Sequence, residues 1–189
     1  MIGWDGLSAL PDRLKDQGEL LVYADGEEWR QEIDGGWVNL VDAEHAEESK
    51  QAITGGVKTL YTVDGLSPVT DTRYARRLSG NVWEANTFAP RAVGDCYTVR
   101  LTFRLETKSN ASGQRVEVDL GIGDDWAINV YSTNFPIIKA SGVSALFSIT
   151  VPIFCIETFG RFGGRFFLAP SHDCEIYQKA IFIQRTFAP

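Results

Sequence analysis

The sequence predicts a mainly β protein whose C-terminal part is an antiparallel, jelly-roll-like β-sandwich. The clearest evidence is Tyr97–Glu106, where an apolar or aromatic residue at every odd position alternates with a polar one, the period of a strand with one buried face. Short apolar runs separated by Gly, Asn, Pro and Ser recur from Cys96 to Phe187, a spacing typical of sandwiches and jelly rolls. The five Trp, six Tyr and eleven Phe residues suit the packing of sheets.

The N-terminal segment contains three short apolar runs that predict strands: Leu20–Tyr23, Trp29–Ile33 and Trp37–Val41. Asp-Gly follows each of the first two runs, and this pair favours tight hairpin turns because glycine adopts a positive φ without strain. We therefore expect a small three-stranded meander. A meander of this size is marginally stable alone, so we expect a partner to cover Trp29 and Trp37.

Asp42–Ile53 is the stretch with a helical pattern. Asp42 is placed to cap its N-terminus, and Gly55-Gly56 follows it as a stop signal,. Acidic residues crowd its first two turns, where they interact favourably with the helix dipole. Its apolar face is thin, so we expect a short surface helix.

Residues 58–92 predict an extended connector with short strands, because turn-forming and polar residues are dense there,. Arg73, Arg76 and Arg77 lie close together in this segment. They are candidates for an electrostatic contact with an acidic neighbour such as the N-terminal segment of another subunit, and the alternative is that they are solvent-exposed charges. With the two tryptophans of the meander they form the candidate partner-binding set.

The C-terminal domain is expected to contain six to eight strands. Its predicted turns are Ser109–Gly113, Gly123–Asp125, Gly160–Gly164 and Ala169–Asp173. Ala145–Ile156 is apolar on both faces, which predicts a central strand covered on both sides. Pro152 within this run predicts a bulge or a bend.

Charge divides the chain into three segments. Residues 1–57 contain 13 acidic and 4 basic residues, residues 58–92 contain 3 and 5, and residues 93–189 contain 9 of each. We therefore predict an acidic anchoring arm with the meander and the short helix at 1–57, a connector at 58–92 and the sandwich at 93–189. The net charge of −7 argues against a general nucleic-acid-binding protein, which needs a basic surface.

The cysteines and the first residues of the chain indicate the cellular compartment in which we expect the protein to be made. Cys96, Cys155 and Cys174 each lie in or beside an apolar run, and three cysteines cannot all pair within one chain, so we expect buried free thiols in a reducing compartment. The first residues lack the basic and apolar regions of a signal peptide, and the run Ile149–Ile156 is too short to cross a bilayer. We expect synthesis in a cytoplasm and no membrane partner.

No pattern of residues predicts catalysis. His45 lies on the expected surface helix, and His172 lies in a turn beside an aspartate and a cysteine without the geometry of a nucleophile and its base. The soft ligands of a zinc site are lacking in number and spacing. Asp119, Asp124 and Asp125 are a candidate Ca²⁺ site, with a charged turn as the alternative. We expect no cofactor.

The layout, with a Trp-rich hairpin module at Leu20–Val41 and a terminal sandwich at Val93–Pro189, resembles accessory structural proteins of tailed-bacteriophage virions. In those families a small N-terminal part anchors to the particle. A C-terminal sandwich, often trimeric and similar to the tumour-necrosis-factor fold, projects from the particle or cements it. Fibres usually carry long repetitive or coiled-coil shafts, which this chain lacks, so the resemblance implies a head decoration, cement or short head-fibre protein.

The resemblance thus implies a non-enzymatic protein that attaches to a phage capsid, stabilises or decorates it, and forms a homotrimer. Its partners would be the major capsid protein or another virion protein, and its final location would be the virion. Two alternatives stay open. One is a tail or baseplate protein whose sandwich loops recognise a host glycan or surface protein, and the other is a carbohydrate-active jelly-roll enzyme.

Overall fold

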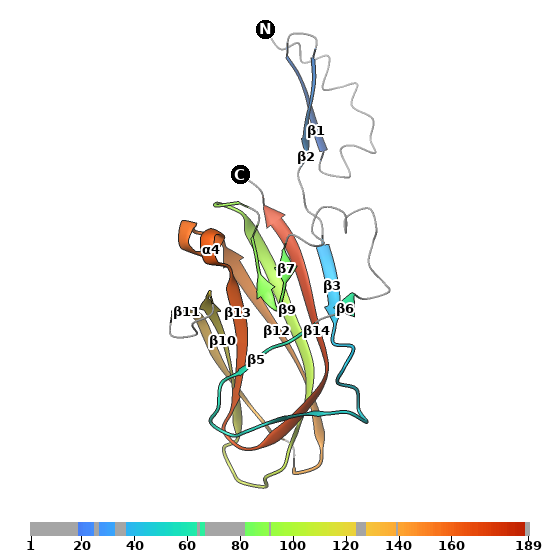
Figure 1. Ribbon diagram of the computed structural model, residues 1–189, viewed down its shortest axis with the longest axis vertical. Coiled ribbons are helices and arrows are strands. Elements are labelled where there is room, and N and C mark those ends of the chain that lie inside the picture. The colour runs from blue at the N-terminus through green and yellow to red at the C-terminus, as the bar shows by residue number, and fades with distance from the viewer. Residues whose placement is uncertain are drawn as a thin grey trace.

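Two antiparallel sheets packed face to face form the body of the protein, which confirms the predicted mainly β sandwich (Figure 1). The computed structural model describes residues 19–24, 27–32, 37–63, 65–66, 82–90, 92–123, 128–138 and 140–187. One sheet, here called the β9 sheet, has the order β12 (Ser144–Phe154), β9 (Cys96–Thr107), β14 (Cys174–Phe187), β3 (Trp37–Val41) and β6 (Gly65–Leu66), and β4 (Gln51–Ile53) also pairs with β14. The other, the β10 sheet, has the order β11 (Asn129–Pro136), β10 (Arg115–Ile122), β13 (Gly164–Pro170), β8 (Thr87–Phe88) and β7 (Trp83–Glu84), and β5 (Thr59–Leu60) also pairs with β13.

The C-terminal part of the chain passes back and forth between the two sheets. β9 is followed by the β10–β11 hairpin in the opposite sheet, the chain returns to β12, crosses to β13 and ends in β14. This alternation is the connectivity of a jelly roll. It makes β11 and β12 the first strands of their sheets, so each has one edge that no other described strand pairs with.

The predicted alternation of β9 is confirmed residue by residue. Its odd-numbered apolar side chains are at most 1% exposed, and they are Tyr97, Val99, Leu101, Phe103 and Leu105. Phe103 stacks on Phe147 with ring centroids 5.3 Å apart and meets the edge of Tyr61 at 6.0 Å. Each such side chain contributes about 1.5–3 kcal/mol by leaving water, so β9 is a main source of the sandwich's stability.

β3 belongs to the sandwich, which corrects the predicted three-stranded meander. β1 (Glu19–Ala24) and β2 (Glu27–Glu32) pair with each other, whereas β3 pairs with β14 from Ala180 to Gln184. The reason is burial, because Val38 and Leu40 of β3 are at most 7% exposed within the core. A small hairpin offers no comparable interior.

The helix predicted over Asp42–Ile53 does not form, and the short helix of the fold lies elsewhere. The segment makes turns in which the Asp42 carboxylate accepts the Glu44 N–H, and it then enters β4, where Ile53 is buried opposite Cys174. The thin apolar face could not stabilise a helix, so strand pairing prevailed. The helix α4 (Glu157–Phe162) occupies part of a predicted turn, and no helix among the described residues is long and apolar enough to span a membrane.

The predicted connector also supplies strands to both sheets. β5 and β8 pair with β13, and β6 pairs with β3. β7 and β8 form a hairpin whose turn residues Ala85 and Asn86 both have positive φ. Asparagine favours this conformation, but the turn contains no glycine that would have predicted it from the sequence. The sequence also predicts a strand at Tyr74–Leu78, which lies outside the described residues. Strands from all three predicted segments, 1–57, 58–92 and 93–189, therefore pair within the two sheets of the sandwich.

β12 is an edge strand, so the prediction of a central strand is wrong for the single chain. Its pairing with β9 runs without a register break through Pro152, so the predicted bulge is also absent. Proline is tolerated there because an edge strand has one side without ladder hydrogen bonds. The apolar pattern that suggested a central strand is real, however, and leaves apolar side chains exposed.

A bulge in β14 turns a lysine into the interior. The register of β14 against β9 shifts between Tyr177 and Ala180, and Gln178 has a φ of +50°. Two residues on the bulged strand then point the same way, and Lys179 becomes fully buried.

The buried ammonium of Lys179 is fully hydrogen-bonded. Its Nζ donates to Asp42 Oδ2 at 2.7 Å, to Gln51 Oε1 at 2.6 Å and to Thr62 Oγ1 at 2.9 Å. An ammonium has three donors, so none is left without a partner. Lys179 thereby ties the chain after β3, the strand β4 and the chain after β5 to the last strand.

Candidate functional site

Of the five residues predicted to bind a partner, the structure places the side chain of Trp37. Trp29 lies on β2 opposite Val22, and its side chain lies outside the described part. Arg73, Arg76 and Arg77 lie outside the described residues altogether. The structure therefore does not test whether these five residues act together, and the candidate site is built from Trp37 outward.

Trp37, Phe182 and Arg100 form a cluster on the outer side of the β9 sheet, here called the aromatic face. The rings of Trp37 and Phe182 have centroids 5.6 Å apart, and the Arg100 guanidinium lies 5.1 Å from the Phe182 centroid. β14 places Phe182 directly opposite Arg100 of β9. Their chain neighbours point inward, so these three side chains are half-buried or exposed on the opposite side.

The residue types of the aromatic face suit binding to protein. Aromatic residues and arginine are enriched at interfaces, where large rigid rings bury area at low entropic cost. The contact between Arg100 and Phe182 contributes about 0.5–1 kcal/mol at an exposed site, and it keeps the guanidinium in place. The cluster is thus preorganised for a contact.

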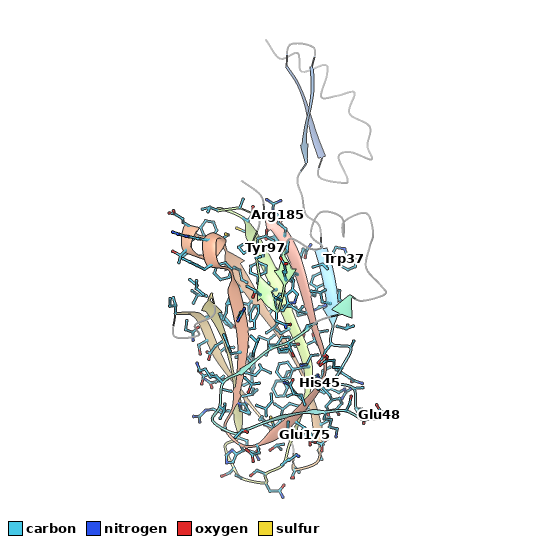
Figure 2. The ribbon with its side chains drawn as sticks, in the orientation of Figure 1. Trp37, His45, Glu48, Tyr97, Glu175 and Arg185 are labelled. Carbon is cyan, nitrogen blue, oxygen red and sulfur yellow. The ribbon has the colours of Figure 1, made fainter. Side chains whose placement is uncertain are left out.

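A buried ion pair fixes the end of β14 near this face. Arg185 Nη2 donates to Asp95 Oδ1 at 2.5 Å, and the other carboxylate oxygen accepts the Tyr97 hydroxyl at 2.8 Å and the Ala92 N–H at 3.1 Å. Figure 2 shows Trp37, Tyr97 and Arg185 toward one end of the sandwich. The pair holds the last strand against β9 where the aromatic face is built.

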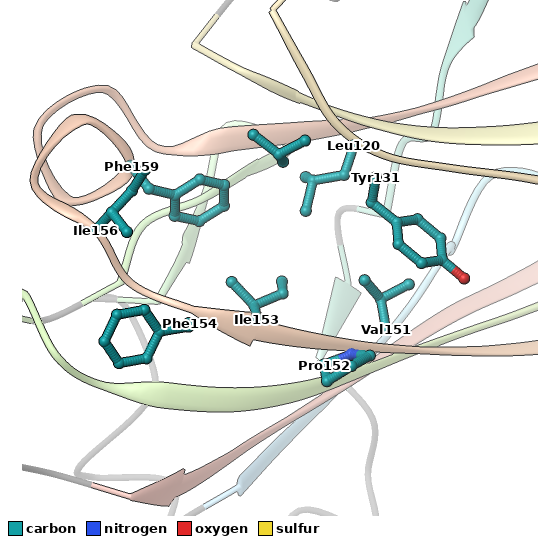
Figure 3. Close-up of a pocket in the computed structure, with 9 residues that line it drawn as sticks. Leu120, Tyr131, Val151, Pro152, Ile153, Phe154, Ile156 and Phe159 are labelled. Atoms are coloured by element: carbon teal, nitrogen blue, oxygen red, sulfur yellow. The ribbon is translucent and has the colours of Figure 1, made fainter.

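A second surface feature lies where the edges of β11 and β12 face each other. An apolar opening of about 150 Å³ enters the sandwich there. It is lined by Leu120, Val130, Tyr131, Val151, Pro152, Ile153, Phe154, Ile156 and Phe159 (Figure 3). Two edge strands and α4 supply most of this lining, so core side chains remain reachable from outside.

A third feature is a polar pocket among the loops at the opposite end, here called the loop pocket. It has a volume of about 390 Å³ and is lined by Gly55, Lys108, Ser109, Ser171, His172 and Asp173. Asp173 accepts the Gly55 N–H at 2.8 Å, and Lys108 pairs with Glu175 at 2.6 Å. Figure 2 places Glu175 toward this end, away from Trp37.

His172 does not complete a catalytic arrangement in the described part of the chain. Its Nδ1 shares a hydrogen bond of 3.0 Å with the Ser171 hydroxyl, which also accepts the Arg115 N–H. A serine nucleophile needs its histidine oriented by a third group, and no described side chain bonds to the other ring nitrogen. His45 binds Asp42 at 2.8 Å and serves the buried network around Lys179.

Asp119 is an ion-pair partner on β10. Its carboxylate accepts hydrogen bonds from Lys58 and, at 3.0 Å, from Asn129. Burial raises its pKa, but these hydrogen bonds and one from Ser132 outweigh it and hold the pKa below the ordinary 3.8. The described residues contain no group of three or more His, Cys, Asp or Glu able to hold a metal. Asp124 and Asp125 lie outside them, so the Ca²⁺ prediction stays untested as a whole.

All three cysteines are free thiols, and they differ in accessibility. Burial raises the pKa of the Cys174 thiol to about 12, with the carboxylates of Asp173 and Glu175 adding to it. Burial and then the charge of Asp95 raise the pKa of Cys155. Cys96 is only half-buried.

We expect a thiol reagent at about pH 8 to modify Cys96 first in the folded protein. Cys155 and Cys174 should react at least about 100-fold more slowly, because the reactive species is the thiolate and both sites disfavour it. Peptide mapping by mass spectrometry after timed labelling measures the three rates. The unfolded chain is the control, in which the three rates should converge, and equal rates in the folded protein would contradict this assignment.

A scan against protein-family models and a search of curated proteins each find no match. Solved structures do share the fold. The chain is similar to the PRD1 vertex protein P5, with 14% identity, a TM-score of 0.50, and coverage of 89% of this chain and 82% of that one.

Two further structures align with lower scores. Eiger TNF from S. frugiperda has 7% identity, a TM-score of 0.47 and coverage of 82% of this chain and 94% of that one. A chain of the Gx strain of infectious bursal disease virus has 7% identity, a TM-score of 0.45 and coverage of 87% of this chain. This chain spans 36% of the length of that viral protein. At 14% identity, the likeness to the PRD1 vertex protein P5 establishes a shared fold.

Phe182 and Arg100 are missing from the predicted partner-binding set. Their proximity depends on the register between β14 and β9, which separates them by 82 positions in sequence and which no local pattern encodes. The sequence contained only a weaker signal for Phe182. Phe182 is a bulky aromatic residue on the side of its strand that alternation assigns to solvent, and such a residue is a candidate contact.

Proposed function

We propose that this chain is a non-enzymatic structural protein of a tailed-bacteriophage virion, which attaches to the capsid as a homotrimer and stabilises or decorates it. The observation that carries the proposal is the fold, shared with the PRD1 vertex protein P5 over most of both chains. The arrangement of the chain supports it, because a separate N-terminal hairpin precedes a complete sandwich. Major capsid protein or another virion protein is the proposed partner.

The pairing of charged side chains inside the sandwich supports a structural role for the protein. Lys179 is paired with Asp42, Arg185 with Asp95, and Lys58 with Asp119. Each of these pairs joins segments far apart in sequence, and paired buried charges fix one arrangement of strands. The buried charges thus hold strands together.

The proposed anchor is the segment before β3. The strands of the sandwich begin at Trp37, so the anchor that the sequence placed at residues 1–57 narrows to residues 1–36, which include Trp29 of β2. Arg73, Arg76 and Arg77 remain proposed contacts to the acidic arm of a neighbouring subunit.

Deleting residues 1–36 should abolish binding to capsids and leave the sandwich folded. The deletion removes β1 and β2, which pair only with each other among the described strands, and keeps every strand of the two sheets. Co-sedimentation with purified capsids measures binding, and thermal unfolding of both proteins checks the fold. The matched control is the full chain with Trp83→Phe, which changes a tryptophan within the sandwich. Undiminished binding by the folded deletion variant would refute the anchor.

A tail protein that recognises a host ligand is the second candidate, and the loop pocket favours it. This pocket lies among loops at the end away from Trp37 and presents an ammonium, a carboxylate, an imidazole and two hydroxyls. Such groups can hydrogen-bond to a glycan. Binding to a glycan array without affinity for capsids would favour this candidate over the first.

A further inference from the structure

The apolar opening between the edges of β11 and β12 reaches a part of the core that the protein's own side chains leave unfilled. Figure 3 shows Leu120 and Phe159 on one side of this space and Val151 and Ile153 on the other. These four side chains are at most 7% exposed, so they belong to the interior of the sandwich. The volume of about 150 Å³ is therefore a gap in the core that is open to solvent at the edge of the two sheets.

The sizes of the inward side chains of β12 explain part of this gap. Toward the start of β12, aromatic rings fill the space between the sheets, because Phe147 stacks on Phe103 at 5.3 Å and meets Phe135 at 6.4 Å. At the opening, the inward residues of the same strand are Val151 and Ile153, which are smaller. Packed sheets lie about 10 Å apart, so these aliphatic side chains leave space that rings would fill.

A bulge where β11 borders the opening explains the rest. Leu120 of β10 pairs with Tyr131 of β11, whereas the next residue, Gly121, pairs with Asn129. Val130 has no partner in this register and is 46% exposed, so its side chain does not fill the core. A bulge bends the strand that carries it, and this bend together with the small residues of β12 accounts for the gap.

The lining of the opening favours an uncharged ligand with an apolar body. None of the described residues that line it is charged, so a charged group there would lose its hydration without gaining a counter-ion. Tyr131 is the one polar side chain among them, and the free edges of β11 and β12 carry unpaired N–H and C=O groups. A neutral polar group such as a hydroxyl can therefore hydrogen-bond at the entrance while an apolar body fills the interior.

The volume of the opening limits the size of that body. An apolar protein cavity of about 150 Å³ lined by Leu, Ile and Phe stays dry and binds benzene. Water is a poor occupant, because it needs about two to four polar partners and the side chains of Leu120, Val151, Ile153 and Phe159 offer none. The body that fits is a single aromatic ring or an alkyl chain of about six carbons.

We propose that the apolar opening is a binding site for a small neutral ligand that carries an aromatic ring or a short alkyl chain. The ligand contacts β12 of one sheet and β10, β11 and α4 on the other side. It thereby joins two sheet edges that no described strand pairing connects. A ligand that binds only the folded protein stabilises it, so the stability of the sandwich depends on the occupancy of this site. The inference goes beyond the proposed structural role.

Benzene and hexan-1-ol are the probes that test this site in the wild-type protein. Each should shift the NMR signals of the methyl groups of Leu120, Val151 and Ile153 in a saturable manner. The methyl signals of Val38 should stay unchanged, because β3 lies three strands away from β12 in the β9 sheet. Hexanoate at neutral pH is the matched control, since it has the same chain length but a charged head, and it should bind at least about 10-fold more weakly.

Val151→Phe should abolish the binding of benzene, because the new ring occupies the space itself. Leu146→Phe is the matched control. It adds the same ring to the same strand, but Leu146 is 61% exposed on the outer side of the sheet, so benzene should still bind. Circular dichroism checks that both variants fold.

Three results would overturn the inference. The first is a wild type whose three sets of methyl signals respond to neither neutral probe, a result that does not depend on whether Val151→Phe folds. The second is undiminished binding of benzene by a folded Val151→Phe variant. The third is equal affinity for hexan-1-ol and hexanoate, which would refute the assignment of a neutral ligand.

Discussion

Replacing Lys179 with methionine should lower the free energy of unfolding by about 3–5 kcal/mol, because it leaves a buried carboxylate without its counter-ion. Lys179 is fully buried, and Asp42 is 3% exposed. Methionine fills a similar volume, so lost packing contributes little. Urea unfolding followed by tryptophan fluorescence measures the change.

Lys108→Met is the matched control for this substitution. Lys108 also pairs with a carboxylate, Glu175, at 2.6 Å, but it is 54% exposed. Exposed pairs contribute up to about 1 kcal/mol, so this variant should stay close to the wild type. Equal effects of the two substitutions would show that the network around Lys179 contributes no more than a surface pair.

The same pair predicts a dependence on pH. Burial raises the pKa of Asp42, but the hydrogen bonds from Lys179, the Glu44 N–H and His45 together lower it by more than burial raises it. The pKa of Asp42 therefore lies below the ordinary 3.8. A carboxyl group whose pKa is depressed by folding stabilises the folded state above its unfolded pKa, and this stabilisation is lost as pH falls through the folded value. The difference between the wild type and Lys179→Met should therefore shrink below about pH 4. A difference that stays constant down to about pH 2 would contradict the assignment of the charge to Asp42.

Gly163→Ala is expected to destabilise the protein by about 3 kcal/mol, from strain and overpacking together. Gly163 ends α4 with a φ of +67° and a ψ of −166°, a region that residues with a Cβ atom avoid. A Cβ atom there would lie 2.7 Å from the carbonyl oxygen of Phe88 and 2.8 Å from a methyl carbon of Thr87. Backbone atoms of β8 cannot move aside as a flexible side chain can.

Gly142→Ala separates the two causes. Gly142 has a similar φ of +76°, but a Cβ atom there would meet nothing within 4 Å. It should cost only the conformational strain, about 1 kcal/mol. Thermal and urea unfolding of both variants test the difference, and equal costs would mean that the approach of Gly163 to β8 is not tight.

Alternation of apolar and polar residues along the sequence predicted the strands whose buried face follows from that alternation alone. The alternation in β9 predicted both this strand and its buried face. The partners of β3 and β4 were not predictable in the same way, because both pair with β14, more than 100 residues later. Asp42 suggested a helix cap, whereas the structure uses its carboxylate for Lys179, a contact that exists only once β14 has its bulge.

The candidate site was predictable to a smaller degree. Trp37 stood out as a surface tryptophan, but its neighbours Phe182 and Arg100 come from two other strands. The apolar opening between β11 and β12 is lined largely by residues of the stretch 126–156, whose apolar pattern suggested an interior strand. Sequence alone cannot tell a strand buried inside one chain from a strand covered by another chain.

The most direct test of the central claim is electron cryomicroscopy of virus particles assembled with and without this chain. The proposed structural role predicts that particles made with the chain show additional density at fixed positions on the capsid, that a trimer of the sandwich fits it, and that particles made without the chain lack it. Identical capsid density in the two maps, together with absence of the chain from the purified particles, would contradict a role as a capsid protein.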